Sequence, residues 1–227
     1  MASGAPRRIV YRGNWSIPLR LRLAGWDHIG DPDASGGYVF DAYQSSTRPE
    51  KLYEVTTPDG GRYDYTHALV PGEAANNSFA AVSPDGRWLV SGEWGTMNRL
   101  LVFPAPLLDP ATPRTGGPLA LAGTVALREP VTDVQGCDFL SATRLLCSSD
   151  GPGRQVLQVD LDAPLAPGTT GASVAAVFAV PTESACRGTY ETEGIDVDPA
   201  HHDLRVEMIP PAPCGAATTI YHYLRAA

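Results

Sequence analysis

The sequence has little lysine and no long apolar runs, and both absences exclude classes of function. Lys51 is the single lysine in 227 residues, and acidic residues outnumber basic residues by 25 to 17. Nucleic acids and anionic membranes need a clustered basic surface, so the sequence argues against both as partners. No window holds about 18 consecutive apolar residues, so we expect no membrane-spanning helix.

The motifs of several common sites are also missing. None of the four cysteines forms a Cys-x-x-Cys pair, which excludes the zinc-ribbon and thioredoxin patterns. The glycine-rich residues 151–153 lack the lysine and the following helix of a phosphate-binding loop. No Gly-x-Ser-x-Gly elbow indicates a serine hydrolase. The first residues, MASGAPRR, contain no apolar signal-peptide core. The excess of arginine over lysine, with abundant alanine and glycine, is typical of a high-GC bacterial genome.

What the sequence does contain is an even number of cysteines in a chain rich in glycine and proline. Cys137 and Cys147 flank a predicted turn at Ala142, so they should lie opposite each other on adjacent strands. Cys186 and Cys214 fall in long predicted loops. We therefore expect two disulfides, Cys137–Cys147 and Cys186–Cys214, and secretion to an oxidising compartment. Four buried free thiols are the alternative.

The clearest local pattern runs from residue 79 to residue 103, FAAVSPDGRWLVSGEWGTMNRLLVF. An apolar strand ends at Ser83, a Pro-Asp-Gly turn follows, and two further strand-like runs cover residues 87–91 and 99–103. This segment resembles the blade repeats of the Tol-system and tryptophan–aspartate propeller families, in which Ser-Pro-Asp-Gly turns join the inner two strands. The resemblance implies a β-propeller, a ring of small sheets around a central channel.

Three other segments repeat this outline, and together they define four units: residues 24–70, 76–127, 133–180 and 190–227. The predicted inner turns are 52, 58 and 57 residues apart and are anchored at Asp31, Ser83, Ser141 and Asp198. Self-similarity at such a period predicts blades. A fourth, outer strand is predicted in the first three units, at residues 62–70, 119–127 and 174–180.

The last unit has no outer strand of its own, whereas residues 8–17 have strand character and no unit. There are 29 residues from Asp198 to the C-terminus and 31 from the N-terminus to Asp31. Their sum, 60 residues, is close to the other periods. We therefore predict an all-β, four-bladed propeller that forms a single domain over residues 1–227. Residues 8–17 would close it as the outer strand of the last blade. A five-bladed or irregular propeller and a β-sandwich are the alternatives.

In a propeller, the loops that enter the inner strands and those that follow the middle strands meet on one face around the channel. In our alignment this face carries carboxylates, amides, one imidazole and several aromatic rings. A ligand-binding role is predicted for Trp26, Tyr43, Asn76, Asn77, Glu93, Trp94, Asp133, Gln135 and Tyr190. An acid–base catalytic role is predicted for His28, Asp27, Glu191 and Glu193.

This inventory suits a hydroxyl-rich ligand, because carboxylates and amides bind hydroxyl groups while aromatic faces cover C–H surfaces. The first hypothesis is therefore a secreted, monomeric propeller that binds a small polar or glycan-like molecule. The second is a cofactor-independent enzyme, such as a lyase, cyclase, isomerase or hydrolase, and the third is a protein-interaction scaffold. We expect no organic cofactor, although the same oxygen atoms could hold a divalent cation such as calcium.

Each group of predicted site residues also has a structural interpretation. The aromatic rings could pack between units, and the paired asparagines could supply turn conformations. Asp27 and His28 could form a hydrogen bond that fixes strand ends. Glu191 and Glu193 could be solvated loop charges.

Overall fold

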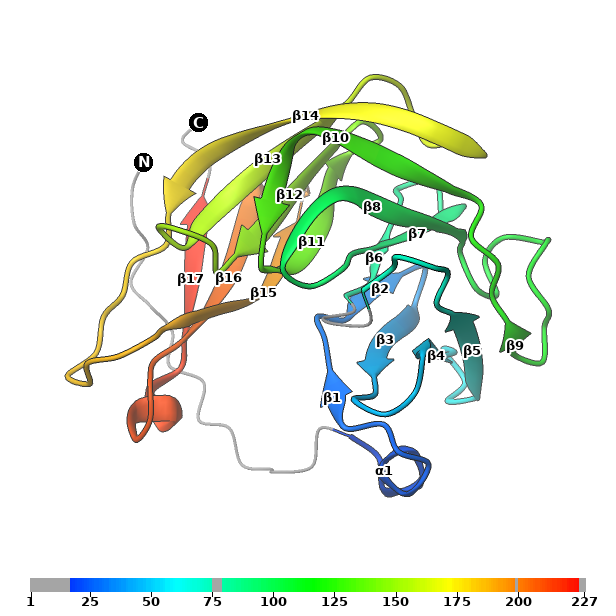
Figure 1. The fold of residues 1–227 in the computed structure, drawn as a ribbon, viewed down its shortest axis with the longest axis horizontal. Helices are drawn as coiled ribbons and strands as arrows, with labels where there is room; N and C mark the ends of the chain where they lie inside the picture. Colours follow the sequence, from blue (N-terminus) through cyan, green and yellow to red (C-terminus); the bar gives the residue numbers. More distant parts are fainter. Residues whose placement is uncertain (1–16, 75–78, 199, 225–227) are drawn as a thin grey trace.

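A computed structural model describes residues 17–74, 79–198 and 200–224 of the chain. The protein is all-β (Figure 1), as predicted: its regular elements are strands, apart from the short helix α1 (Leu19–Leu23) and the 3-10 turn η1 (Cys214–Ala217). Among the described residues, no helix is long and apolar enough to cross a membrane.

The first sheet is built mainly from the first unit. Its order is β1 (His28–Ile29), β3 (Tyr38–Gln44), β4 (Glu50–Thr56), β5 (Arg62–Ala68) and β9 (Gly117–Pro118), and β2 (Asp33–Ser35) also pairs with β3. Gly36 and Gly37 join β2 to β3 with φ of 59° and 84°. Two consecutive positive φ angles are what a type I′ hairpin requires. The inner turn predicted at Asp31 is therefore wrong, because Asp31 lies between β1 and β2, which both pair with β3.

The second and third units share one eight-stranded sheet, which curls until it is nearly closed. Its order is β11 (Val134–Ser141), β12 (Arg144–Ser149), β13 (Gln155–Leu161), β14 (Gly168–Ala179), β10 (Gly123–Thr132), β8 (Thr96–Pro104), β7 (Trp88–Ser91) and β6 (Ala81–Val82). The end strands β11 and β6 contact each other. Within each unit, consecutive strands pair in antiparallel fashion.

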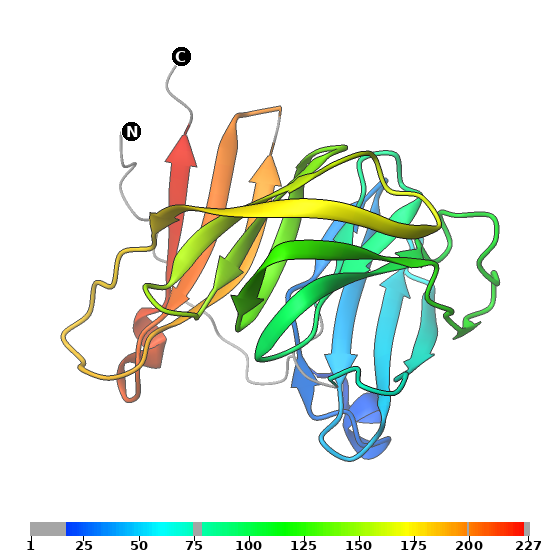
Figure 2. The same ribbon diagram turned by 45° about the horizontal axis from the view of Figure 1, so that its top comes forward.

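The outer strands β10 and β14 pair in parallel and join the second unit to the third, from Gly123 beside Gly168 to Leu127 beside Ala172. Figures 1 and 2 show these two strands running together across the molecule. A Cβ atom on Gly123 would lie 2.0 Å from the carbonyl oxygen of Gly168, so only glycine permits this approach. The sequence did not predict this junction. The outer strand expected at residues 119–127 begins only at Gly123, in β10, and the short strand β9 before it pairs with β5 of the first sheet.

The fourth unit forms a three-stranded antiparallel sheet of β15 (Glu191–Asp198), β16 (Asp203–Ile209) and β17 (Thr219–Leu224). The strand predicted to complete it, residues 8–17, lies outside the described residues except for Ile17. Both predicted disulfides are confirmed. Cys137–Cys147 links β11 to β12, and Cys186–Cys214 links the segment before β15 to η1.

Apolar clusters lie between consecutive units. Phe40 and Phe103 belong to the cluster between the first and second units. Val125 and Leu145 belong to the cluster between the second and third, and Val156 and Met208 to the one between the third and fourth. The fourth unit meets the first through a hydrogen bond, in which the Ile195 N–H donates to Asp31 Oδ2 at 3.1 Å. Each unit therefore contacts the next, and the last contacts the first.

Candidate functional site

A cavity of about 420 Å³, here called the polar cavity, opens near the starts of the inner strands β1, β11 and β15. Its wall is drawn from all four units and from the segment leading into β15: His28, Gln44, Trp94, Asp133, Gln135, Asp150, Thr189, Glu191 and Glu193. Six of the predicted site residues therefore share one wall: His28, Trp94, Asp133, Gln135, Glu191 and Glu193.

Local backbone geometry positions two of these residues. His28 lies opposite Gln44 in the β1–β3 ladder, which holds both at the cavity. Asp133 has φ of 50° between β10 and β11, a left-handed conformation that aspartate tolerates better than most residues. Its backbone N–H donates to the Gly95 carbonyl at 3.0 Å. This turn directs the chain from the outer strand of the second unit to the inner strand of the third.

Asp150 organises the part of the wall that the third and fourth units share. Its Oδ2 accepts a hydrogen bond from Gln135 Nε2 at 2.8 Å. Its Oδ1 accepts from the Thr192 backbone N–H at 2.6 Å and from the Thr192 hydroxyl at 2.8 Å. Because Thr192 lies between Glu191 and Glu193, Asp150 fixes the start of β15 beside the cavity. The alignment of the units placed Asp150 on this face but predicted no binding or catalytic role for it.

Glu193 is the wall residue whose ionisation is most affected by its surroundings. Burial, together with the negative charges of Glu191, Asp150 and Glu207, raises its pKa from 4.5 to about 7. Burial also raises the pKa of Glu207. Within the described part of the chain, the Glu193 carboxylate has no hydrogen-bond partner.

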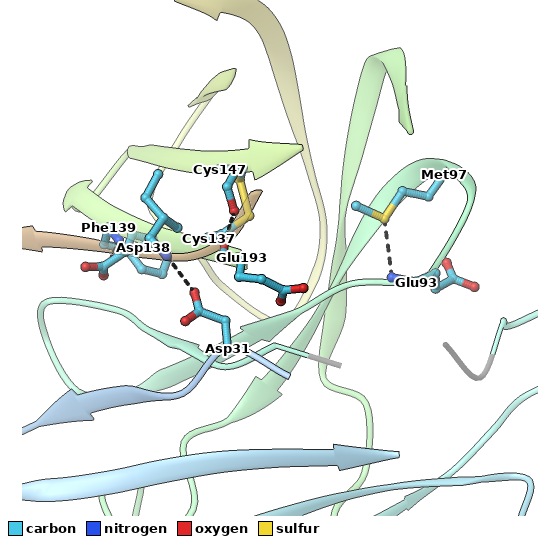
Figure 3. Close-up of a disulfide and its surroundings, with 10 residues drawn as sticks. Asp31, Glu93, Met97, Cys137, Asp138, Phe139, Cys147 and Glu193 are labelled. Carbon is cyan, nitrogen blue, oxygen red and sulfur yellow. Dashed lines mark hydrogen bonds between the residues drawn. A yellow bond between two sulfur atoms is a disulfide. The ribbon is translucent and has the colours of Figure 1, made fainter. Parts of the chain in front are cut away.

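Three aspartates continue from the polar cavity along the inner strands. Figure 3 shows two of them, Asp31 and Asp138, with Glu193 beside the Cys137–Cys147 disulfide. Each aspartate accepts a backbone N–H from a neighbouring unit: Asp33 from Val82 at 2.6 Å, Asp138 from Val197 at 2.7 Å, and Asp31 from Ile195 at 3.1 Å. These bonds link the inner strands to one another.

Burial has a large effect on these aspartates as well. It raises the pKa of Asp33 to about 6 and that of Asp138 to about 7, and it raises the pKa of Asp31 well above 3.8. Among the residues that the structure describes, no group of three or more His, Cys, Asp or Glu side chains is arranged to hold a metal ion. The geometry therefore lends no support to the calcium hypothesis.

Three predicted site residues of the first unit lie outside the wall of the polar cavity. Trp26 and Tyr43 are buried in an apolar cluster with Leu21 and Leu52. Asp27 accepts hydrogen bonds from the backbone N–H of Ser46, at 3.1 Å, and from its hydroxyl. These contacts account for the positions of the three side chains without a ligand.

Two more predicted residues, Glu93 and Tyr190, are buried and have protein partners. Arg99 Nε donates to Glu93 Oε2 at 2.7 Å. Burial raises the pKa of Glu93, but this bond, the Ala74 N–H and the charges of Arg99 and Lys51 together lower it from 4.5. The Tyr190 hydroxyl donates to the Cys186 carbonyl at 3.2 Å, and its own carbonyl accepts from Arg154 Nε at 2.6 Å. Asn76 and Asn77 lie outside the described residues.

No protein-family model matches this chain, and no curated protein matches it. Its function must be argued from the chemistry of the polar cavity.

Proposed function

We propose that this protein binds a small polar, glycan-like molecule in the polar cavity. The observation that supports the proposal most is the composition of one wall, which combines the imidazole of His28, the indole of Trp94, the amide of Gln135 and the carboxylate of Glu193. A few polar groups beside an aromatic surface are typical of sites for hydroxyl-bearing ligands. The volume of about 420 Å³ also lies in the range of roughly 300–1,000 Å³ that small-molecule sites occupy.

A thermal-shift screen with neutral monosaccharides and polyols, followed by calorimetric titration of each hit, tests this proposal. We expect Glu193→Gln and His28→Ala each to weaken binding by about 2- to 10-fold, the effect of losing one hydrogen bond. Glu183→Gln is the matched control, because Glu183 is exposed and is not part of the cavity wall. A hit that binds all three variants as tightly as the wild type would bind elsewhere.

A second candidate function, cofactor-independent acid–base catalysis, is favoured by the raised pKa of Glu193. A carboxyl group with a pKa of about 7 can donate or accept a proton near neutral pH. We propose Glu193 and His28 as the acid–base pair, and not Asp27, because the Asp27 carboxylate is bound to Ser46. An enzyme of this kind would lose turnover in Glu193→Gln with no decrease in melting temperature, whereas a binding protein has no turnover to lose.

The finer architecture that we propose is a four-bladed propeller closed by residues 8–17. It is supported by the four consecutive antiparallel units, the apolar clusters between them and the aspartate bonds between inner strands. The β10–β14 pairing would join two of the blades at their outer strands. We expect deletion of residues 1–16 to lower the melting temperature by at least about 5 °C. A truncated chain that melts like the full chain would contradict the closure.

We further propose that the protein works, as a monomer, in an oxidising compartment outside the cytoplasm. The two disulfides support this location, because such bonds form and persist where thiols are not kept reduced.

A further inference from the structure

A second and larger cavity, here called the apolar cavity, lies between the sheets of the third and fourth units. Its volume is about 730 Å³, and it is located at the ends of β11 and β15 opposite to the polar cavity. Its wall is mostly aliphatic and aromatic and includes Leu140, Val177, Phe178, Leu204 and Leu224. The strands of the third unit and the sheet of the fourth unit lie side by side in both ribbon views (Figures 1 and 2), and residues of both units line the cavity.

Three of the wall residues are unusually exposed for large apolar side chains. Leu140 is 39% exposed, Val177 is 46% exposed and Leu224 is 53% exposed. Single exposed apolar residues are common on soluble proteins, but a group around one concave surface is typical of a binding site. Covering these side chains with another apolar surface would be favourable.

Among the residues that the structure describes, two polar groups in the same wall are buried and find no hydrogen-bond partner. They are Oδ1 of Asp203, a residue that is 8% exposed, and the hydroxyl of Tyr223. A buried polar atom without a hydrogen bond costs free energy, and a ligand that supplies the missing bond recovers it. The wall therefore combines a large apolar surface with two polar groups that lack partners, which is the usual plan of a small-molecule site.

The partners of Asp203 indicate what kind of polar group is missing. Its Oδ2 already accepts a hydrogen bond from Arg205 Nε at 2.8 Å and lies 3.2 Å from His222 Nδ1. Arg205 also lies 2.8 Å from Asp196 and 3.7 Å from Asp198, so its single charge is shared among three carboxylates, and Oδ1 of Asp203 still lacks a hydrogen-bond donor. Arg144, which also lines the cavity, is paired with Asp160 at 2.5 Å, and the carboxylates around Asp203 disfavour an anionic ligand.

We infer that the apolar cavity binds a neutral, largely hydrocarbon molecule that carries a hydroxyl group. The hydrocarbon part covers Leu140, Val177 and Leu224, and the hydroxyl group hydrogen-bonds to Asp203 or Tyr223. This inference does not depend on the function of the polar cavity, which has a separate wall.

Two probe molecules of equal size test the inference on the full chain: 1-octanol, which can donate a hydrogen bond, and 1-methoxyheptane, which cannot. Binding is followed by ¹H–¹³C spectra of protein labelled at leucine and valine methyl groups. We expect 1-octanol to shift the methyl signals of Leu140, Val177 and Leu224. Its Kd should be about three- to tenfold lower than that of the ether, the effect of one hydrogen bond.

Substitutions in the wall should weaken this binding selectively. Val177→Arg puts a charge into the cavity and should weaken 1-octanol binding at least tenfold. Val70→Arg is the matched control, because Val70 is 40% exposed and is not part of this wall. Tyr223→Phe should weaken 1-octanol binding about two- to fivefold if the hydroxyl groups interact.

Several outcomes would overturn the inference. They are an absence of methyl shifts up to the solubility limit, equal affinity for the two probes, and unchanged binding to Val177→Arg. Binding that appears only after deletion of residues 1–16 would also overturn it, because the cavity would then belong to the chain's own N-terminal segment.

Discussion

The polar cavity and the apolar cavity lie at opposite ends of the same two strands, β11 and β15, yet their walls differ in chemistry. The polar cavity is lined by four carboxylates, and burial makes the charge of Glu193 unfavourable. The apolar cavity adjoins the core cluster that contains Val156 and Met208. At the polar cavity, a buried charge therefore lowers the stability of the fold. At the apolar cavity, the adjoining apolar cluster raises it.

The largest effect that would sharpen this comparison is expected in the apolar cluster between the third and fourth units, which adjoins the apolar cavity at Val156. Met208 is 2% exposed, so Met208→Ala should lower the free energy of unfolding by about 2–5 kcal/mol through lost burial and a new void. Urea denaturation followed by tryptophan fluorescence measures this change. Val177→Ala, in the exposed part of the wall, should stay within about 0.5 kcal/mol of the wild type. If Met208→Ala also lowered the free energy of unfolding by no more than about 0.5 kcal/mol, this apolar cluster would contribute little to stability.

The next largest effect is expected in the polar cavity and depends on pH. The pKa of Glu193 is raised from 4.5 to about 7 in the folded protein, so the folded state holds its proton more tightly than the unfolded state. The stability that comes from this proton is complete below about pH 4.5 and is lost as the pH rises to about 7. Glu193→Gln should therefore be about 1–3 kcal/mol more stable than the wild type at pH 8, and equally stable at pH 4.

Chemical denaturation at the two pH values measures this difference, with Glu183→Gln as the control for the loss of one negative charge. An equal change at both pH values would mean that the pKa of Glu193 is not raised, and the contrast between the two cavities would lose its electrostatic part.

The smallest effect concerns the unpartnered hydroxyl of Tyr223. Because this hydroxyl has no hydrogen bond to lose within residues 17–74, 79–198 and 200–224, Tyr223→Phe should leave the free energy of unfolding unchanged or raise it by up to about 1 kcal/mol. Tyr190→Phe is the matched comparison, since the Tyr190 hydroxyl donates to the Cys186 carbonyl, and it should cost about 0.5–1.5 kcal/mol. Equal losses in the two variants would indicate a partner for Tyr223.

Much of the strand plan could be predicted from the sequence, because local signals determine it. The Pro-Asp-Gly turn after Ser83 and the placement of Cys137 and Cys147 around one hairpin were sufficient for the second and third units. In the first unit, Asp31-Pro32 was interpreted as the turn, although the Gly36-Gly37 pair is the stronger hairpin signal. Because of that error, Asp31 was not expected beside the inner strands, where its carboxylate accepts a hydrogen bond from the Ile195 N–H.

The site could be predicted only in part, for a physical reason. Aligning the units brings His28 and Glu193 to one end of the strands, but it does not show which side chains face a cavity. Tyr43 lies in a strand with both faces partly buried. The alternation of apolar and polar residues in this strand therefore does not show to which face the Tyr43 side chain points. The role of Asp150 depends on its bonds to Gln135 and Thr192, which are distant in sequence and leave no local pattern.

The parallel ladder between β10 and β14 has a consequence for how the molecule opens. From Gly123 to Leu127, it makes the backbone hydrogen bonds of the second and third units part of one continuous network. Neither unit can separate at its periphery without breaking bonds in the other, so their amide protons should exchange with solvent in a single cooperative event. The first unit has a parallel contact of only two residue pairs, between β5 and β9. Its outer edge can therefore open at a lower free energy than the β10–β14 junction, while the cluster around Phe40 and Phe103 keeps its inner face packed against the second unit.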